Sequence, residues 1–413
     1  MAPRLLPRAV AVGALLACGV ARADVAPADV TLSGYVQADC VVHRQSSVDE
    51  IAPGGEPLNH DTFSIPRSRL RAASGRGWLR GALELDAATG RASTVRVAEA
   101  SVSARWTPPG TEGVALVTAS MGLIRIPFGF ELAERSTKRL FLERSHASRA
   151  LFPGVYDLGA SVSGGHAFLR YAVAVMNGEP ASRSGEIPED PSAAKDVLAR
   201  VGVDTEAGRR VRVRAGVSAV IGAGLHRGTP ASKDVLVWRD GNEDGLVQLT
   251  EIQAVPGAPA TPSQAFERFG VGADLGVIAR LPVVGELSLF GEIVRAANLD
   301  RGGTPADPVA SGRLLRERGY AVGLTQELTR HAMIGVRYDR YDPDADADEQ
   351  RGLRRVPRSR ARSTLAFAAA LRRPPGRLVL EYDRNQNALG REASGAPTSM
   401  ADDALTLRAE IVF

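Results

Sequence analysis

The sequence predicts an all-β protein, a transmembrane antiparallel β-barrel of about 16 strands with long external loops. Segments in which apolar and polar residues alternate recur along the whole chain, which is the pattern of strands with one apolar and one wet face. The connections between these segments alternate between short and long. The final segment stops on the aromatic Phe413, as a last strand does when it pairs with the first strand of a closed barrel.

The alternating segments define the predicted strands, with boundaries uncertain by about two to four residues. In the last segment Leu405 and Leu407 share one face, and Arg408 and Glu410 share the other. The sixteen segments are residues 30–43, 63–73, 77–87, 94–106, 114–127, 155–164, 166–176, 195–205, 209–225, 266–281, 286–296, 318–328, 331–342, 360–371, 377–384 and 402–413.

The connections carry independent information about the fold. Short ones, such as residues 107–110 and 373–376, are rich in the turn formers proline and glycine. Short periplasmic turns and longer external loops are typical of outer-membrane barrels. Several soluble β-sandwich domains would also show short alternating strands, but they would not explain this rhythm. The long polar connections are residues 45–62, 128–154, 177–194, 226–265, 298–317, 343–359 and 387–401, whereas one connection on the long side, after Asp86, is brief.

The first residues resemble a secretory signal. Arg4 and Arg8 precede the short apolar run of residues 9–20, and Ala21-Arg22-Ala23 is an A-x-A cleavage site. We therefore expect residues 1–23 to be a signal peptide and residues 24–413 to form a single barrel domain. An alternative is a lipoprotein box that ends at Cys18.

Charge and cysteine content exclude several classes of protein. Removal of the signal lowers the formal charge from +4 to +1, so basicity is no argument for a nucleic-acid partner. No run of about 18 apolar residues occurs, so a membrane must be crossed by strands. Cys40 would be the single cysteine left, which excludes an intramolecular disulfide. No nucleophile elbow, phosphate-cradling glycine loop or zinc spacing predicts an enzyme.

The alternation also assigns charged residues to the barrel interior. A lipid-facing arginine near the bilayer centre costs about 2–4 kcal/mol, so the arginines of polar faces should point inward. Two ladders result, Arg67, Arg69 and Arg71, and Arg210, Arg212 and Arg214. Guanidinium groups offer forked donors to phosphate or carboxylate oxygens, and ladders without an intervening acid should favour anions. The alternative is pairing with the inward acids Asp39, Glu84, Glu99, Asp204, Asp274, Glu292, Glu381 and Glu410.

One stretch resembles a known family. Residues 122–131, Gly-Leu-Ile-Arg-Ile-Pro-Phe-Gly-Phe-Glu, are similar to the G-x-x-x-x-P-F-G-x-E segment of the phosphate-selective porin O/P family. The segments Phe141 to Ser145, Phe152 to Gly154 and Asp157 to Gly159 resemble the residues that follow it in that family. The resemblance covers residues 122–178, and the remainder of the chain matches in architecture alone.

The resemblance implies that the loop of residues 128–154 folds into the channel and narrows it, that three copies assemble, and that phosphate-like anions pass. This loop has a single lysine, and the lumen carries many acids, so we expect a general anion-leaning porin in the outer membrane of a Gram-negative bacterium, open to small solutes such as phosphate. A hydrolytic barrel enzyme and a non-transporting adhesin or scaffold barrel are the alternatives. The loop holds Arg135, Lys138, Arg139, Arg144 and Arg149 against Glu131, Glu134 and Glu143, an excess of two positive charges.

Residues 240–251 match the twelve-residue calcium loop of an EF-hand. Gly245 permits the sharp turn that such loops require, but no pair of helices is expected around it because prolines follow closely. The pattern predicts a structural Ca²⁺ site in the longest external loop, with Asp240, Asn242, Asp244, the Leu246 carbonyl and Glu251 as ligands.

Overall fold

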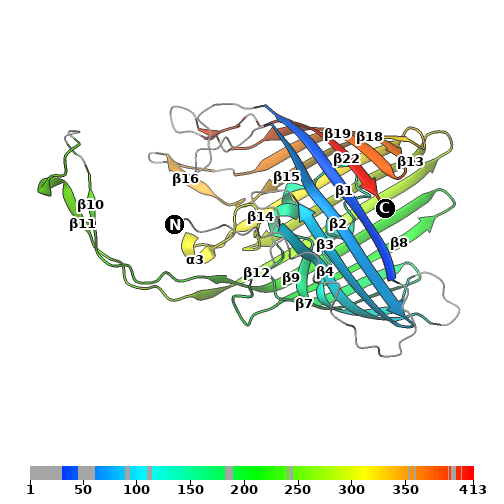
Figure 1. Cartoon of the computed structure of the whole chain (residues 1–413), viewed down its shortest axis with the longest axis horizontal. Coiled ribbons are helices and arrows are strands. Elements are labelled where there is room, and N and C mark those ends of the chain that lie inside the picture. Colours follow the sequence, from blue (N-terminus) through cyan, green and yellow to red (C-terminus); the bar gives the residue numbers. More distant parts are fainter. Residues whose placement is uncertain are drawn as a thin grey trace, which may run out of the picture.

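The protein is a closed antiparallel barrel of sixteen strands, as its alternating sequence predicts (Figure 1). The computed structural model describes residues 30–44, 61–88, 94–108, 114–181, 189–239, 241, 245–351, 354–357, 360–388, 390–391, 397–400 and 402–413. The signal-peptide prediction, and most of the first external loop, lie outside these residues. Among the described residues, no helix is both long and apolar enough to span a membrane.

The barrel strands follow one another in chain order, each paired with its neighbours in sequence. Their bounds are β1 (Val30–His43), β2 (Thr62–Arg76), β3 (Leu79–Ala88), β4 (Thr94–Trp106), β5 (Val117–Arg125), β6 (Tyr156–His166), β7 (Leu169–Met176), β8 (Asp196–Ala207), β9 (Val211–His226), β12 (Gln264–Leu281), β13 (Gly285–Ala297), β14 (Arg316–Glu327), β15 (Ala332–Asp342), β18 (Arg362–Arg373), β19 (Gly376–Gln386) and β22 (Ala404–Val412).

The seam between β1 and β22 closes the barrel. Residues 35–43 of β1 pair with residues 404–412 of β22 in unbroken register. Beyond the last strand, the amide of Phe413 donates to the Gly34 carbonyl at 2.9 Å, and the Gly34 amide donates to the Phe413 carbonyl at 2.7 Å. The terminal aromatic residue therefore completes the ladder, and the barrel sheet closes without an open edge.

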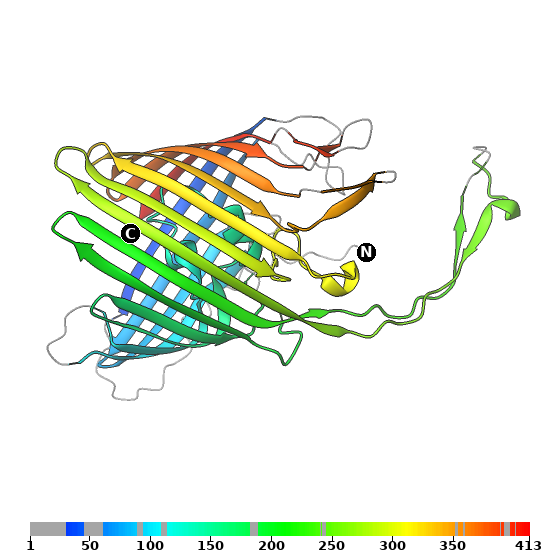
Figure 2. The same cartoon turned by 180° about the vertical axis from the view of Figure 1, so that it is seen from behind.

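Long and short connections lie at opposite ends of the barrel, which we call the outer and inner rims (Figures 1 and 2). The outer-rim connections hold α3 (Pro308–Ser311) and three small hairpins. The hairpins are β10 (Val235–Trp238) with β11 (Ile252–Val255), β16 (Asp348–Arg351) with β17 (Arg354–Pro357), and β20 (Gly390–Arg391) with β21 (Pro397–Thr398). The connection from β9 to β12 extends far from the barrel and carries β10 and β11 at its end (Figure 2).

Side chains alternate between the two faces of the wall. On β9, Val217 and Ile221 are exposed on the outside, whereas Ser218 and Val220 are buried inside. The tyrosines Tyr320 and Tyr382 are exposed on the outer surface. Tyr35 instead turns inward, and its hydroxyl lies 2.8 Å from the Ser136 hydroxyl.

Candidate permeation site in the barrel lumen

The loop between β5 and β6, residues 128–154, folds into the barrel lumen, and we call it the constriction loop. Two glycines of the Gly-x-x-x-x-Pro-Phe-Gly segment are required for its entry. Gly122 has φ +121°, and a Cβ atom there would lie 2.2 Å from the Ala100 carbonyl oxygen. Gly129 has φ +61°, and a Cβ atom there would lie 2.2 Å from a carboxylate oxygen of Glu292. Both positions combine a left-handed backbone with a close neighbour, which only glycine tolerates.

The constriction loop contains two short helices, α1 (Gly129–Ala133) and α2 (His146–Leu151). Ser145 caps α2, because its hydroxyl accepts a hydrogen bond from the Ser148 amide at 3.3 Å. Arg144 holds the turn of this helix. Its guanidinium donates to the Ser148 carbonyl and hydroxyl and to the carbonyls of Phe152 and Pro153, at 2.8 to 3.1 Å.

Apolar side chains of the constriction loop pack against one side of the barrel wall. Phe128 and Phe152, whose ring centroids are 5.0 Å apart, belong to a buried cluster that includes residues from β7, β8, β9 and β13. A second cluster joins residues 140–142 to alanines of β18 and to Val379 of β19. The lumen is therefore not wet throughout, because the loop and this side of the wall form a dry core.

Carboxylates and a hydroxyl of the wall accept hydrogen bonds from the loop backbone. Glu292 of β13 accepts from the amides of Phe130 and Glu131 at 2.9 and 3.2 Å. Glu381 of β19 accepts from the Leu142 amide at 2.9 Å. Asp339 of β15 and Ser218 of β9 accept from two further loop amides, those of His146 and Gly129. These contacts satisfy buried N–H groups that have no partner within a regular helix or sheet.

Arginines of the same wall donate to loop carbonyls. Arg337 reaches the Glu143 carbonyl at 2.7 Å, Arg377 the Arg139 carbonyl at 2.8 Å, and Arg408 the Leu142 carbonyl at 3.1 Å. Side chains on the wall strands from β9 to β22 thus bind the main chain of the loop. Its side chains at positions 135 and 139 are left on the opposite side, toward β1 to β6.

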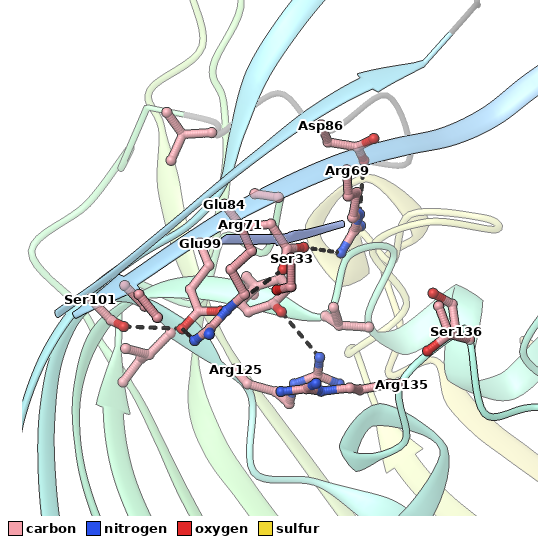
Figure 3. A pocket seen from close by; sticks show the side chains of 18 of the residues that line it. Ser33, Arg69, Arg71, Glu84, Asp86, Glu99, Ser101, Arg125, Arg135 and Ser136 are labelled. Atoms are coloured by element: carbon pink, nitrogen blue, oxygen red, sulfur yellow. Dashed lines mark hydrogen bonds and ion pairs between the residues drawn. The ribbon is translucent and has the colours of Figure 1, made fainter. Parts of the chain in front are cut away.

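A cavity of about 1160 Å³ separates the constriction loop from the strands β1 to β6. Figure 3 shows Arg69, Arg71 and Glu99 on the wall, and Arg135 of the constriction loop beside Arg125 at the end of β5. Five carboxylates line it, Glu84, Asp86, Glu99, Glu134 and Glu143. Ten arginines line it, Arg67, Arg69, Arg71, Arg80, Arg96, Arg125, Arg135, Arg139, Arg144 and Arg149. The cavity therefore carries an excess of positive charge.

The first predicted ladder is paired with acids rather than free. Arg69 donates to Glu84 at 2.7 Å and to Asp86 at 3.3 Å, and Arg71 donates to Glu99 at 3.3 Å. Arg67 binds both carboxylate oxygens of Glu143, at 2.9 and 2.8 Å. Arg67, Arg69 and Arg71 thus form ion pairs, which stiffen the wall of the cavity.

Six of the ten cavity arginines have no carboxylate partner among the described residues. Arg125 and Arg144 donate to carbonyls and hydroxyls instead, and Arg149 lies beside the His146 ring. The other three are Arg80, Arg135 and Arg139. The Nε and Nη1 atoms of Arg139 are buried without any hydrogen-bond partner there. Burial, reinforced by Arg67, lowers the pKa of the Arg139 guanidinium to about 10, which leaves it charged at neutral pH. An uncompensated cation of this kind favours an anionic solute.

The other predicted pathway residues lie in different settings. Lys138 is exposed but does not line the cavity. Arg149 lines it, with one nitrogen 3.4 Å from the His146 ring. Arg210 is exposed in an inner-rim turn, whereas Arg212 binds Asp204 at 2.6 Å and Arg214 lies 3.7 Å from it. The second ladder therefore has an acid beside it.

Sequence reasoning missed part of this site. Arg80, Arg96 and Arg125 alternate inward like the predicted ladders, so strand periodicity could have found them. Periodicity did predict that Glu292 and Glu381 face inward, but it gave no signal that they hold the loop, because their partners are main-chain atoms far away in sequence.

The predicted calcium loop is only partly described. Asp240, Asn242 and Asp244 lie outside the described residues, whereas Leu246 and Glu251 lie within them. The Glu251 carboxylate accepts from the Gly241 amide and from the Trp238 indole, both at 3.1 Å. No group of three or more histidine, cysteine, aspartate or glutamate residues that could hold a metal ion occurs in the described part of the chain.

Comparisons with known proteins agree on the fold. No family model matches the chain, so the resemblance to the phosphate-selective porin O/P family is not confirmed, and no curated protein matches it in sequence. The outer membrane protein OmpT of Vibrio cholerae, in a trimer form, has a TM-score of 0.53 at 9% identity, over 94% of this chain and 99% of that chain.

Two further solved structures share the fold. The outer membrane channel DcaP of Acinetobacter baumannii has a TM-score of 0.53 at 13% identity, covering 94% of this chain and 97% of that chain. An anion-selective porin from Comamonas acidovorans has a TM-score of 0.52 at 11% identity, covering 94% of this chain and 100% of that chain. The chain thus has the sixteen-stranded barrel fold found in outer-membrane proteins.

Proposed function

We propose that the chain is an outer-membrane porin, a water-filled and anion-leaning diffusion channel for small solutes such as phosphate. The observation that carries this proposal is the cavity beside the constriction loop, where Arg80, Arg135 and Arg139 have no carboxylate partner among the described residues. Guanidinium groups present forked donors that suit phosphate and carboxylate oxygens. The printed name of the Comamonas protein, an anion-selective porin, agrees with this reading of the charges.

Removal of the loop charges tests the proposal. Replacing Arg135, Lys138 and Arg139 together with glutamine should lower the permeability ratio of anion to cation, measured as the reversal potential in a salt gradient across a planar bilayer. The matched control replaces Arg227, Lys233 and Arg239, three exposed basic residues outside the lumen, with glutamine. An unchanged reversal potential in the first variant would contradict the assignment.

Selectivity among anions requires a second measurement. We propose weak rather than strong preference for phosphate, because four of the ten cavity arginines, Arg67, Arg69, Arg71 and Arg96, are already paired with acids and five carboxylates line the same cavity. Phosphate added to a chloride bath should therefore reduce single-channel current only at millimolar concentrations. A block at micromolar phosphate would instead indicate a high-affinity phosphate site.

We further propose that three copies assemble in the membrane. The support is the fold shared with the Vibrio cholerae protein, which is described in a trimer form. Chemical cross-linking in native membranes tests this proposal, and bands no larger than the single chain would contradict it.

We also propose that residues 240–251 bind Ca²⁺ and order the tip of the long external connection. The support is the spacing of oxygen ligands, together with Glu251 folded back against Gly241 near the start of the loop. Calcium should protect this connection from protease at millimolar concentrations in the intact protein, and Glu251→Gln should abolish the protection. Equal cleavage with and without calcium would rule the site out.

A further inference from the structure

A cluster of arginines faces outward near the outer rim, and none of its members lines the cavity described above. Arg295 of β13 lies directly opposite Arg318 of β14, and Arg340 of β15 lies opposite Tyr320 of β14. These arginines are exposed, whereas their chain neighbours Val294, Glu317 and Asp339 are buried on the inner face. With Arg316, one pleat further out on β14, they form what we call the outer-rim arginine patch.

The patch lies at the level where a membrane has its headgroups. Arg318 and Arg340 each lie two positions outward, on the same strand face, from Tyr320 and Tyr338, whose ring centroids are 6.0 Å apart. Exposed tyrosines of a barrel mark the boundary between the hydrocarbon and the headgroups. On the other side of this boundary the outward surface is apolar, with Ile293, Val322 and Leu324 exposed.

The charges of the patch are not balanced within the described residues. Asp346 lies 3.0 Å from Arg316 and 3.6 Å from Arg318. Arg295 and Arg340 have no ion pair in that part of the chain. The nearest acids in the strand register are Asp342, opposite Arg318, and Glu267 on β12. Like charges directly opposite each other on one face destabilise a sheet, so an anion between the strands would relieve the repulsion.

We propose that the outer-rim arginine patch binds the phosphate groups of a phosphorylated glycolipid in the outer leaflet. This inference rests on the proposed location of the barrel in an outer membrane. Guanidinium forks hold phosphate oxygens in two parallel hydrogen bonds, and the acyl chains lie along the apolar strip below the tyrosines. The ligand is a lipid phosphate rather than free phosphate, because the patch and the apolar strip are continuous on one surface.

Lipid binding by the purified full-length barrel in detergent tests the proposal. The probe is fluorescent lipid A that carries two phosphates, compared with the same glycolipid after removal of its phosphates. The variant Arg295→Gln/Arg340→Gln should bind the phosphorylated probe roughly tenfold or more weakly, since each basic residue at a charged lipid surface contributes a several-fold gain. The matched control is Arg330→Gln/Arg373→Gln, two exposed arginines at the inner rim.

The outcomes separate this inference from the proposed function. Equal binding by the Arg295/Arg340 variant, equal binding of the dephosphorylated probe, or complete displacement by inorganic phosphate alone would each overturn the lipid site. Channel recordings on the same preparations confirm that the variant is folded and conducts like the wild type. If the wild type binds the phosphorylated probe selectively but does not conduct, the channel proposal fails and the lipid site stands.

Discussion

Arginines of the same loop play two different parts in this molecule. Arg144 uses its guanidinium to bind four acceptors within the loop, so it holds the backbone in shape. Arg139 leaves two nitrogens without a partner beside the cavity. The sequence could count both as loop cations, but only the fold shows which one holds the loop and which one is left unpaired beside the cavity. The buried contacts of Arg144 depend on a helix whose position the sequence pattern does not define.

The Glu143 carboxyl links this loop to the wall and makes the link sensitive to acid. Burial alone would raise the pKa of Glu143, but attraction to Arg67 and Arg408 outweighs burial and lowers the pKa far below its ordinary value of 4.5. A depressed pKa in the folded state means that the carboxylate stabilises the fold above about pH 4.5 and that this stabilisation is lost as the pH falls further.

Glu143→Gln should therefore reduce the loss of thermal stability on acidification. We expect the melting temperature of the wild type to fall more steeply than that of the variant as the pH drops below about 4.5, and the two curves to run parallel between pH 6 and pH 5. Curves that stay parallel below pH 4.5 as well would show that Glu143 does not contribute.

At the scale of elements, the strands were predictable and the packing of the constriction loop was not. The nine-residue β22, for example, follows the alternation of its sequence in its burial. The Pro-Phe-Gly segment and its resemblance to a porin family indicated that residues 128–154 enter the lumen. The direction in which the loop leans depends on contacts such as Leu142 to Glu381, which join residues 239 positions apart. Local sequence patterns contain no information about such pairs.

The main-chain anchors of the constriction loop can be tested one at a time. Glu292→Ala leaves the Phe130 and Glu131 amides without an acceptor, at a cost of about 1–3 kcal/mol for each buried group. We expect a looser loop, seen as larger and noisier single-channel currents and faster proteolysis within residues 128–154. Glu286→Ala, at the inner rim, is the control. Quiet currents of wild-type size in the Glu292 variant would show that this anchor is dispensable.

At the scale of the whole molecule, the barrel interior is divided in two. A wet lumen surrounded by an apolar surface was the prediction, and it holds for the side of β1 to β6. On the opposite side, buried residues such as Leu132 and Leu151 pack against the wall. Alternation within strands could not reveal this division, because the inward positions that form the dry core include small residues such as Ala366 and Ala368 that fit either environment.

The ion selectivity of the reconstituted wild-type protein tests the central claim most directly. A single reversal-potential measurement in a potassium chloride gradient reports whether current passes through the lumen and which ion carries it. Because the cavity has ten arginines against five carboxylates, we predict stepwise conductance with a reversal potential displaced toward that of chloride. An absence of conducting steps, or a displacement toward the potassium potential, would contradict the account.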